Sequence, residues 1–341
     1  MQALVVHGAN DARVEEVPDP TPAPNQVLVA MEWGGICGSD IAYWKHGASG
    51  TAILREPLIL GHEVAGTVAA VGSEVKGVQE GDRVAIHPAT LVGDYQVSPQ
   101  LQPRTNLWPE VRYFGSAAFL PHEHGAFSQF RVVRPDQLRP LPDNVSTKEG
   151  ALAEPFGVAL HAVSIAGSVQ GRSVLVNGCG PIGALVVAAA KARGASLITA
   201  ADLSPSSLQI AKAMGADEIV NIAAGETLPP DVEVAIEASG APRALGGVIA
   251  SVQRGGVLVQ VGNLPAGEVS AALGNIVTRE IQYRGSYRFV DEISDAIKLM
   301  STGIDVSPLM THSFDLSDAV EALAVAADRS TGSSKVMLKL S

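Results

Sequence analysis

The sequence predicts an α/β protein of two domains, one rich in β-strands and one built on a doubly wound parallel sheet. The chain has 341 residues, which is too long for one ordinary hydrophobic core. Its pattern also changes near Gly150, where short strands between proline- and glycine-rich turns give way to helices that alternate with apolar strands. We therefore expect a first domain over 1–148, completed by 288–341, and a second domain over 149–287.

The first domain is expected to consist mainly of short strands. Its apolar runs are separated by proline- and glycine-containing turns, such as the stretch 18–24. The predicted strands are 3–6, 27–30, 64–71 and 82–86. A helix over 289–301 and a strand over 334–340 follow the second domain, and we assign both to the first.

The second domain is expected to alternate strands and helices. Near-continuous apolar runs are typical of parallel strands buried on both faces. The predicted strands are 173–177, 197–202, 218–220, 232–236 and 256–261, and the predicted helices are 154–166 and 182–193.

Composition excludes several classes of partner. The net charge of −11 disfavours nucleic-acid binding, because phosphates would be repelled. No amino-terminal signal pattern and no apolar run of about 18 residues occur, so we expect no membrane span and a cytoplasmic protein. The two cysteines, Cys37 and Cys179, fall in separate motifs, which makes a disulfide framework improbable.

A glycine-rich turn predicts a dinucleotide site. Gly178, Gly180 and Gly183 have the G-x-G-x-x-G spacing, follow a strand and open a helix. Asp202 ends the next strand and can accept hydrogen bonds from ribose hydroxyls, and no arginine follows it to bind a 2′-phosphate, so NAD is favoured over NADP. The alternative is a structural turn beside a surface aspartate. The further cofactor candidates are Pro181, Ile182, Val261, Gly262 and Ser286.

Four residues are candidate metal ligands. Cys37, His62, Glu63 and Glu154 offer the sulfur, nitrogen and oxygen atoms that zinc prefers. Taken singly, the cysteine could be a small buried hydrophobe, and the His-Glu pair could be surface or hydrogen-bonding residues. Glu154 precedes Pro155 where the chain enters the second domain, which adds a third feature to the set.

These positions carry a family resemblance that covers essentially the whole chain. The run Gly61-His62-Glu63-x-x-Gly66-x5-Gly72-x-x-Val75 looks like the zinc signature of the medium-chain alcohol dehydrogenases. The segment 37–47 and the pair Glu154-Pro155 are similar to the sorbitol dehydrogenase branch. The resemblance implies a GroES-like catalytic domain and a Rossmann NAD-binding domain.

Other segments look most like the L-idonate 5-dehydrogenases. They are 112–117, 121–122 and 284–289. The resemblance implies reversible oxidation of a sugar acid, L-idonate to 5-keto-gluconate, with a sorbitol- or xylitol-type polyol dehydrogenase as the alternative. It implies zinc held by Cys37, His62 and either Glu63 or Glu154, and this choice stays open.

The resemblance also implies roles in catalysis and substrate binding. Ser39 and Glu154 are candidates for proton transfer. A local turn hydroxyl is the alternative for Ser39. Arg288 is a candidate for the substrate carboxylate, which a guanidinium can bind bidentately, although a surface salt bridge would also explain it. The remaining pocket candidates are Tyr43, His46 and Phe289.

The sequence departs from the family pattern at two places. The loop 89–111, where many relatives hold a second zinc with four cysteines, contains no cysteine, so we predict one catalytic zinc and no structural zinc. We expect this loop to be held by apolar packing of Leu91, Tyr95, Leu101, Leu107 and Trp108. Ala42 stands where related enzymes often have a proton-relaying histidine, so any relay would use Ser39, Glu154 or water.

Two rival functions follow from the same fold. One is a zinc-free quinone reductase that uses NADPH, and the other is an NAD-sensing protein without chemistry. The intact set of zinc ligand types argues against both, and Asp202 argues against NADPH. Relatives are dimers or tetramers, and we expect strand 257–261 to pair across a two-fold axis.

Overall fold

The computed structural model describes residues 1–93, 96–265 and 267–341. The chain divides into two compact units, one formed by 1–154 and 310–341 and the other by 155–309. The division differs from the prediction over 288–309, which group with the second unit. The predicted α/β class, with one unit rich in strands and the other containing a parallel sheet, is confirmed.

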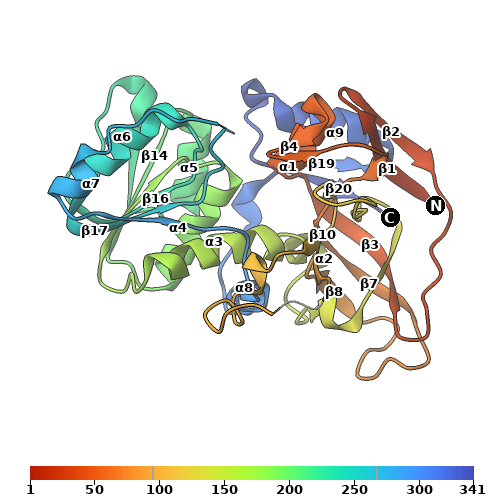
Figure 1. Ribbon diagram of the computed structural model, residues 1–341. Coiled ribbons are helices and arrows are strands. Elements are labelled where there is room, and N and C mark those ends of the chain that lie inside the picture. Colours follow the sequence, from red (N-terminus) through yellow and green to blue (C-terminus); the bar gives the residue numbers. More distant parts are fainter. Residues whose placement is uncertain (94–95, 266) are drawn as a thin grey trace. The chain divides into compact units, whose positions relative to one another are not determined.

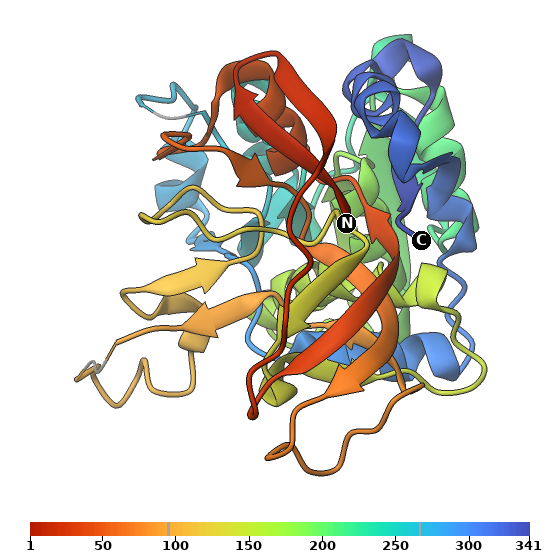
Figure 2. The ribbon, with the colours of Figure 1, turned by 90° about the vertical axis from the view of Figure 1, so that its right-hand side faces the viewer.

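The first unit is built mainly of antiparallel strands. A seven-stranded sheet has the order β12-β8-β7-β3-β20-β19, with β11 also paired to β3, and a smaller sheet has the order β2-β1-β6. Figure 2 shows the long strands β3 and β7 of this unit, in red to orange, running side by side. The strands are β1 (Gln2–Gly8), β2 (Asp11–Glu16), β3 (Val27–Gly35), β4 (Ala48–Ser49), β5 (Ala52–Ile53), β6 (Leu58–Ile59), β7 (Glu63–Val71), β8 (Arg83–Ile86), β9 (Ala89–Leu91), β10 (Val111–Tyr113), β11 (Phe130–Val133), β12 (Leu138–Pro140), β19 (Met310–Asp315) and β20 (Lys335–Lys339).

Alternation of buried and partly exposed residues places one face of β3 in the core. Val27, Val29 and Met31 are fully buried, as expected for a strand with one face turned inward. The carboxyl-terminal strand β20 returns to this sheet and pairs antiparallel with β3, so that Met337 lies opposite Gly35. The helices of this unit are α1 (Gly38–His46), α2 (Thr147–Gly150) and α9 (Ala319–Ala327).

The second unit contains a six-stranded parallel sheet in the order β15-β14-β13-β16-β17-β18. Numbered along the chain this is 3-2-1-4-5-6, the order of a doubly wound dinucleotide-binding fold. Figure 1 shows helices around strands β14, β16 and β17 of this unit. The strands are β13 (Ser173–Asn177), β14 (Leu197–Asp202), β15 (Glu218–Asn221), β16 (Val232–Glu237), β17 (Val252–Gln260) and β18 (Gln282–Gly285), and the helices are α3 (Ala153–Ala166), which begins in the first unit, α4 (Pro181–Ala192), α5 (Pro205–Ala213), α6 (Pro242–Ser251), α7 (Gly274–Thr278) and α8 (Glu292–Ser301).

Strand β17 is not an edge of this sheet. It is paired on one side with β16 and on the other with β18. The expectation that 257–261 pairs with another copy is therefore wrong, because the hydrogen-bonding groups of that strand are already used. The free edge at this end of the described sheet is β18.

Helix α8 belongs to the second unit because it packs closely on α3. A Cβ added at Gly157 would lie 3.1 Å from the backbone nitrogen of Ile293, so the two helices approach each other at a glycine. The His161 Nδ1 and Glu292 Oε1 atoms are 2.6 Å apart. The other carboxylate oxygen of Glu292 accepts the backbone N–H groups of Val290 and Asp291.

These contacts predict a pH-dependent contribution of Glu292 to stability. Burial raises the pKa of Glu292, but the hydrogen bond from His161 and the backbone donors outweigh it, so the net pKa is lowered. Stabilisation is then present above the pKa of an unfolded glutamate, about 4.3, and is lost as the pH falls through the lower folded value. We expect Glu292→Gln to remove about 1 kcal/mol at neutral pH and to make unfolding in urea less dependent on pH below 5.

The exposed Glu268→Gln is the matched control, and it should leave the pH dependence of unfolding unchanged. A Glu292→Gln protein with the same acid sensitivity as the wild type would contradict this assignment.

Candidate metal centre and cofactor turn

Three of the predicted ligands come together in the first unit. One ligand atom each from Cys37, His62 and Glu63 lies within 4.8 Å of the others. Cys37 is the N-cap of α1, two residues after the end of β3, while Glu63 begins β7. Gly35 and Glu63 are partners in the β3–β7 ladder, so strand register brings the cysteine to the His-Glu pair.

The donor set fits a zinc ion. It offers one sulfur, one imidazole nitrogen and one carboxylate, as in catalytic zinc sites that keep an open position. His62 Nδ1 is buried and has no hydrogen-bond partner among the described residues. Burial lowers the pKa of His62, but the neighbouring groups Cys37, Asp40 and Glu154 outweigh burial and raise it to about 10, so the surrounding charges favour a positive charge here.

Asp40 holds two of the ligand segments together. Its carboxylate is fully buried and accepts the backbone N–H of Cys37 at 2.9 Å and that of Gly61 at 3.2 Å. Burial raises the pKa of this carboxyl group. Sequence analysis assigned no role to Asp40. The available signal was an acidic residue in the first turn of α1, three positions after the cysteine at the N-cap.

Lys335 is the second residue that sequence analysis missed. Its Nζ lies 2.7 and 2.6 Å from the two carboxylate oxygens of Glu63 and donates to the Ile36 carbonyl at 3.1 Å. The side chains of Lys335 and Glu63 are 2% and 1% exposed. Burial lowers the pKa of Lys335, but Glu63 and Cys37 outweigh this effect and raise it. No local sequence pattern marks this lysine, because its partner is 272 residues away.

Glu154 lies outside the three-residue set. The Tyr113 hydroxyl donates to its Oε1 at 2.5 Å, and both residues are buried. The Tyr113 and His62 rings meet edge to face with centroids 5.7 Å apart. Of the two carboxylates left open by the sequence, Glu63 is grouped with Cys37 and His62, whereas Glu154 is engaged by a tyrosine.

The other residues suggested for the first unit have mixed positions. Ser39 is half-buried in the first turn of α1, two residues after Cys37. Tyr43 is buried, and its hydroxyl oxygen accepts the backbone N–H of Ala117 at 3.0 Å. His46 is exposed in the last turn of α1, where a basic side chain complements the helix dipole.

One member of the apolar cluster that the sequence suggested for the cysteine-free loop is exposed. Leu91 is 42% exposed, and Tyr95 lies outside the described residues. The Trp108 indole N–H donates to the Leu101 carbonyl at 2.9 Å, so these two residues do meet through a polar contact. The expectation about Leu91 is wrong, because β9 is fixed through backbone and side-chain hydrogen bonds.

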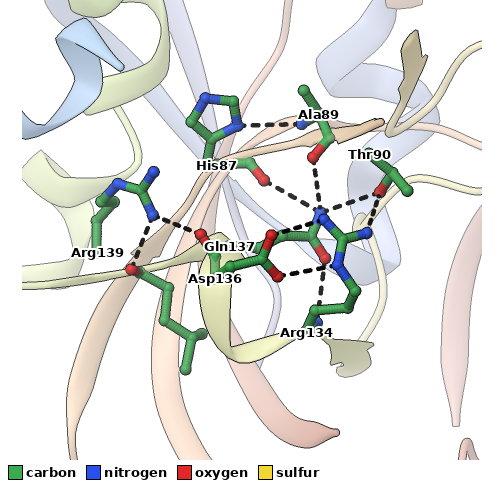
Figure 3. A network of polar contacts seen from close by, with 8 residues as sticks. His87, Ala89, Thr90, Arg134, Asp136, Gln137 and Arg139 are labelled. Carbon is green, nitrogen blue, oxygen red and sulfur yellow. Dashed lines mark hydrogen bonds and ion pairs between the residues drawn. The ribbon is translucent and has the colours of Figure 1, made fainter. Parts of the chain in front are cut away.

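A polar network centred on Gln137 holds β9 (Figure 3). The Gln137 carboxamide is buried and donates to the carbonyls of His87 at 3.2 Å and Ala89 at 3.3 Å. The Arg134 guanidinium donates to the Thr90 hydroxyl at 3.0 Å, and Gln137 also donates to this hydroxyl at 3.3 Å. We call Arg134, Gln137 and their contacts with 87–90 the Gln137 clamp.

The nucleotide turn has the geometry that its glycines predict. Gly178 has φ +88°, and a Cβ at Gly183 would lie 1.8 Å from the Gly178 carbonyl oxygen. A Cβ at Gly180 would meet nothing within 4 Å, so this glycine leaves open space beside the amino terminus of α4. That space fits the close backbone approach of a pyrophosphate.

Asp202 is tied directly to this turn. Its carboxylate accepts the backbone N–H of Cys179 at 2.6 Å and that of Ser204 at 2.8 Å. The Cys179 side chain is buried, and burial raises its thiol pKa, which agrees with a packing role.

A buried carboxylate that sequence analysis missed fixes the turns beside it. Glu237, at the end of β16, accepts Asn177 Nδ2 at 3.1 Å, Gln260 Nε2 at 2.5 Å and the backbone N–H of Gly240 at 3.1 Å. Its carbonyl accepts the N–H groups of both Val261 and Gly262 at 2.9 Å. A charged residue at the end of an apolar strand was the available signal.

The segment after β18 contains three further candidates. The Ser286 hydroxyl is buried without a hydrogen-bond partner among the described residues, as expected where a cofactor would supply one. Arg288 has φ +51°, an uncommon backbone conformation for a non-glycine residue, and its guanidinium lies 4.9 Å from the Tyr287 ring centroid. Phe289 is buried.

Comparisons with known proteins agree with this geometry. Residues 23–143 match the family described as "Alcohol dehydrogenase GroES-like domain", and 181–302 match "Zinc-binding dehydrogenase". A sorbitol dehydrogenase from Bos taurus is 39% identical over 341 residues, covering 94% of this chain and 91% of the relative. An L-idonate 5-dehydrogenase (NAD(P)(+)) from Escherichia coli K12 is 37% identical over 320 residues, covering 92% of each.

A solved structure is similar over nearly the full length. The crystal structure of L-idonate 5-dehydrogenase from Escherichia coli K-12 has a TM-score of 0.92 and 35% identity, and the match covers 99% of this chain and 97% of the other. In the part of the chain that the structure describes, no helix is both long and apolar enough to cross a membrane.

The Gln137 clamp predicts the effect of a single substitution on stability. Gln137→Ala would remove two hydrogen bonds to the carbonyls of the half-buried residues His87 and Ala89, and at about 0.5–1.5 kcal/mol for each bond the two together contribute about 1–3 kcal/mol. We expect the free energy of unfolding in urea to fall by that amount.

The matched control is Gln100→Ala, which removes an exposed glutamine from the loop 89–111 and should change stability little. Equal effects of the two variants would show that the clamp does not hold β9.

Proposed function

Because the chain belongs to the zinc-dependent medium-chain dehydrogenases, in their sorbitol dehydrogenase branch, we propose that it is an NAD-dependent oxidoreductase that converts L-idonate to 5-keto-gluconate. The observation that carries the chemistry is the grouping of half-buried Cys37 with buried His62 and Glu63. Small sugar or polyol substrates are shared by both groups of relatives. A zinc-free reductase would need no such donor set.

The reaction removes a hydride and a proton from one secondary alcohol. Zinc, when bound, supplies a Lewis acid that polarises the substrate hydroxyl, and the nicotinamide accepts the hydride. Cys37, His62 and Glu63 would hold the metal, and Lys335 would fix the orientation of Glu63.

Two residues of the chain can carry the proton. Ser39 lies in the first turn of α1 beside Cys37, and Glu154 is buried next to the His62–Tyr113 ring pair. Because Ala42 cannot relay a proton, we assign this step to Ser39 and, through water, to Glu154.

The cofactor assignment rests on Asp202 and its turn. The carboxylate already accepts two backbone N–H groups and retains lone pairs for ribose hydroxyls, whereas a 2′-phosphate would be repelled by its charge. We therefore propose NAD as the preferred cofactor. Val261, Gly262 and Ser286 would contact its nicotinamide half.

Arg288 is the proposed partner of the substrate carboxylate, although its presence does not by itself select a sugar acid over a polyol. A guanidinium can bind a carboxylate with two parallel hydrogen bonds. Its uncommon backbone conformation is the kind of strain that concentrates at ligand sites. Tyr43, His46 and Phe289 remain pocket proposals, with His46 the weakest because it is exposed.

The alternative is a sorbitol- or xylitol-type polyol dehydrogenase. Sorbitol dehydrogenases match this chain at least as closely in sequence as L-idonate 5-dehydrogenase does. We also propose that the protein is a dimer or tetramer, with the free edge of β18 as the element available to a second copy.

Metal analysis tests the proposed centre. We expect one zinc per chain in the wild type and strong loss of zinc in Cys37→Ser, because a hydroxyl is a poor substitute for a thiolate ligand. The matched control is Cys179→Ser, which changes the other cysteine and should retain the metal. A wild type without zinc would overturn the proposal, and two zinc ions per chain would overturn the single-site prediction.

Substrate assays test the role of Arg288. NADH formation should be fastest with L-idonate among L-idonate, D-gluconate, sorbitol and xylitol. Arg288→Ala should lower kcat/KM for L-idonate by about 10- to 100-fold, since hydrogen bonds to charged groups are worth about 1.5–3 kcal/mol, and should affect sorbitol much less. The exposed Arg329→Ala is the control. Equal losses on the acid and the polyol, with good sorbitol turnover, would favour the alternative.

A further inference from the structure

We propose that Tyr113 is a positioning residue that keeps Glu154 from becoming a fourth protein ligand of the zinc. The inference rests on the proposed zinc centre. Catalytic zinc sites have three protein ligands and an open position, whereas four protein ligands close a site. Glu154 is a fourth potential ligand beside the set of Cys37, His62 and Glu63. An open position therefore requires a contact that keeps the Glu154 carboxylate from coordinating the metal.

The tyrosine makes the contact that this role requires. Its hydroxyl donates to Glu154 Oε1 at 2.5 Å, a short distance typical of a hydrogen bond to a carboxylate. No other side chain in the described part of the molecule donates to this carboxylate. The Tyr113 ring also packs edge-on against the His62 ring, at 5.7 Å between centroids. One side chain therefore touches both a proposed ligand and the carboxylate that is excluded from the set.

Removal of the Tyr113 hydroxyl would favour movement of the Glu154 carboxylate toward the metal. Glu154 is 5% exposed, so water cannot readily replace the lost donor. A buried carboxylate without a donor is costly. A nearby zinc ion is the partner that would satisfy it best, because carboxylate oxygens are zinc ligands.

The strand that carries Tyr113 is itself fixed. In the β9–β10 pair Tyr113 lies opposite Ala89, and each strand has three residues. So short a ribbon is marginal alone. The Gln137 clamp bonds the Ala89 carbonyl and the Thr90 hydroxyl, which anchors β9 next to the position that pairs with Tyr113 (Figure 3). The clamp thus holds in place the strand from which Tyr113 reaches Glu154.

The test uses the full-length protein loaded with cobalt(II), whose visible absorption reports the ligands around the metal. Tyr113→Phe removes only the hydroxyl. We expect its cobalt absorption bands to change in position and intensity and the fraction of metal removed by a chelator in a fixed time to fall. We also expect kcat to fall by about tenfold or more, as is typical when a partner of a metal-site residue is removed.

A double variant identifies the cause. Tyr113→Phe with Glu154→Gln should restore a wild-type-like cobalt spectrum, because the amide is a far weaker ligand than the carboxylate. Ser128→Ala is the matched control, since it removes another buried hydroxyl, which donates to the Phe130 carbonyl, and it should leave the spectrum unchanged.

The outcomes separate the two proposals. A Tyr113→Phe spectrum equal to that of the wild type would overturn the role of Tyr113 while leaving the metal centre intact. A changed spectrum that persists in the double variant would also overturn it. A wild type that binds neither zinc nor cobalt would overturn the proposed function, and this inference with it.

Discussion

The buried ion pair between Lys335 and Glu63 is the interaction on which the proposed metal centre depends. Placing a carboxylate at 1% exposure beside a thiol and a second carboxylate carries a large desolvation cost and strong repulsion. The lysine offsets both, with its ammonium group 2.6–2.7 Å from the two oxygens of Glu63.

This pair also explains why the first unit needs the end of the chain. Lys335 begins β20, which pairs with β3, and β3 ends two residues before Cys37. The same carboxyl-terminal strand therefore completes the sheet and carries the lysine that balances the charge of Glu63. A first unit without β20 would leave Glu63 as an uncompensated buried charge, a far more damaging state than the loss of a surface salt bridge.

Sequence alone predicted the fold well and the site in part. The βαβ pattern and the turn at Gly178 were readable because hydrophobic periodicity and glycine spacing are local properties. The metal-ligand types were also visible. The roles of Lys335 and Tyr113 were not, since their partners lie 272 and 41 residues away and no local pattern marks such a pair. Glu237 was missed although its place at the end of an apolar strand was visible, because its partners on β13 and β17 lie 60 and 23 residues away. Helix 292–301 was assigned to the wrong side of the boundary, because its packing on α3 is a tertiary property.

The second unit also uses a buried carboxylate, which there fixes a glycine-containing turn. A turn that lets a ligand approach the backbone must lack side chains, and a Cβ at Gly262 would lie 2.3 Å from the backbone nitrogen of Gly240. Such a turn has little side-chain packing to hold it, so a buried acceptor does so. Glu237 binds donors from the neighbouring strands β13 and β17 and from the turn after its own strand. Asp40 plays the corresponding part at Cys37 and Gly61. In both units, a buried carboxylate that accepts backbone N–H groups gives a glycine-containing segment one fixed conformation before any ligand binds.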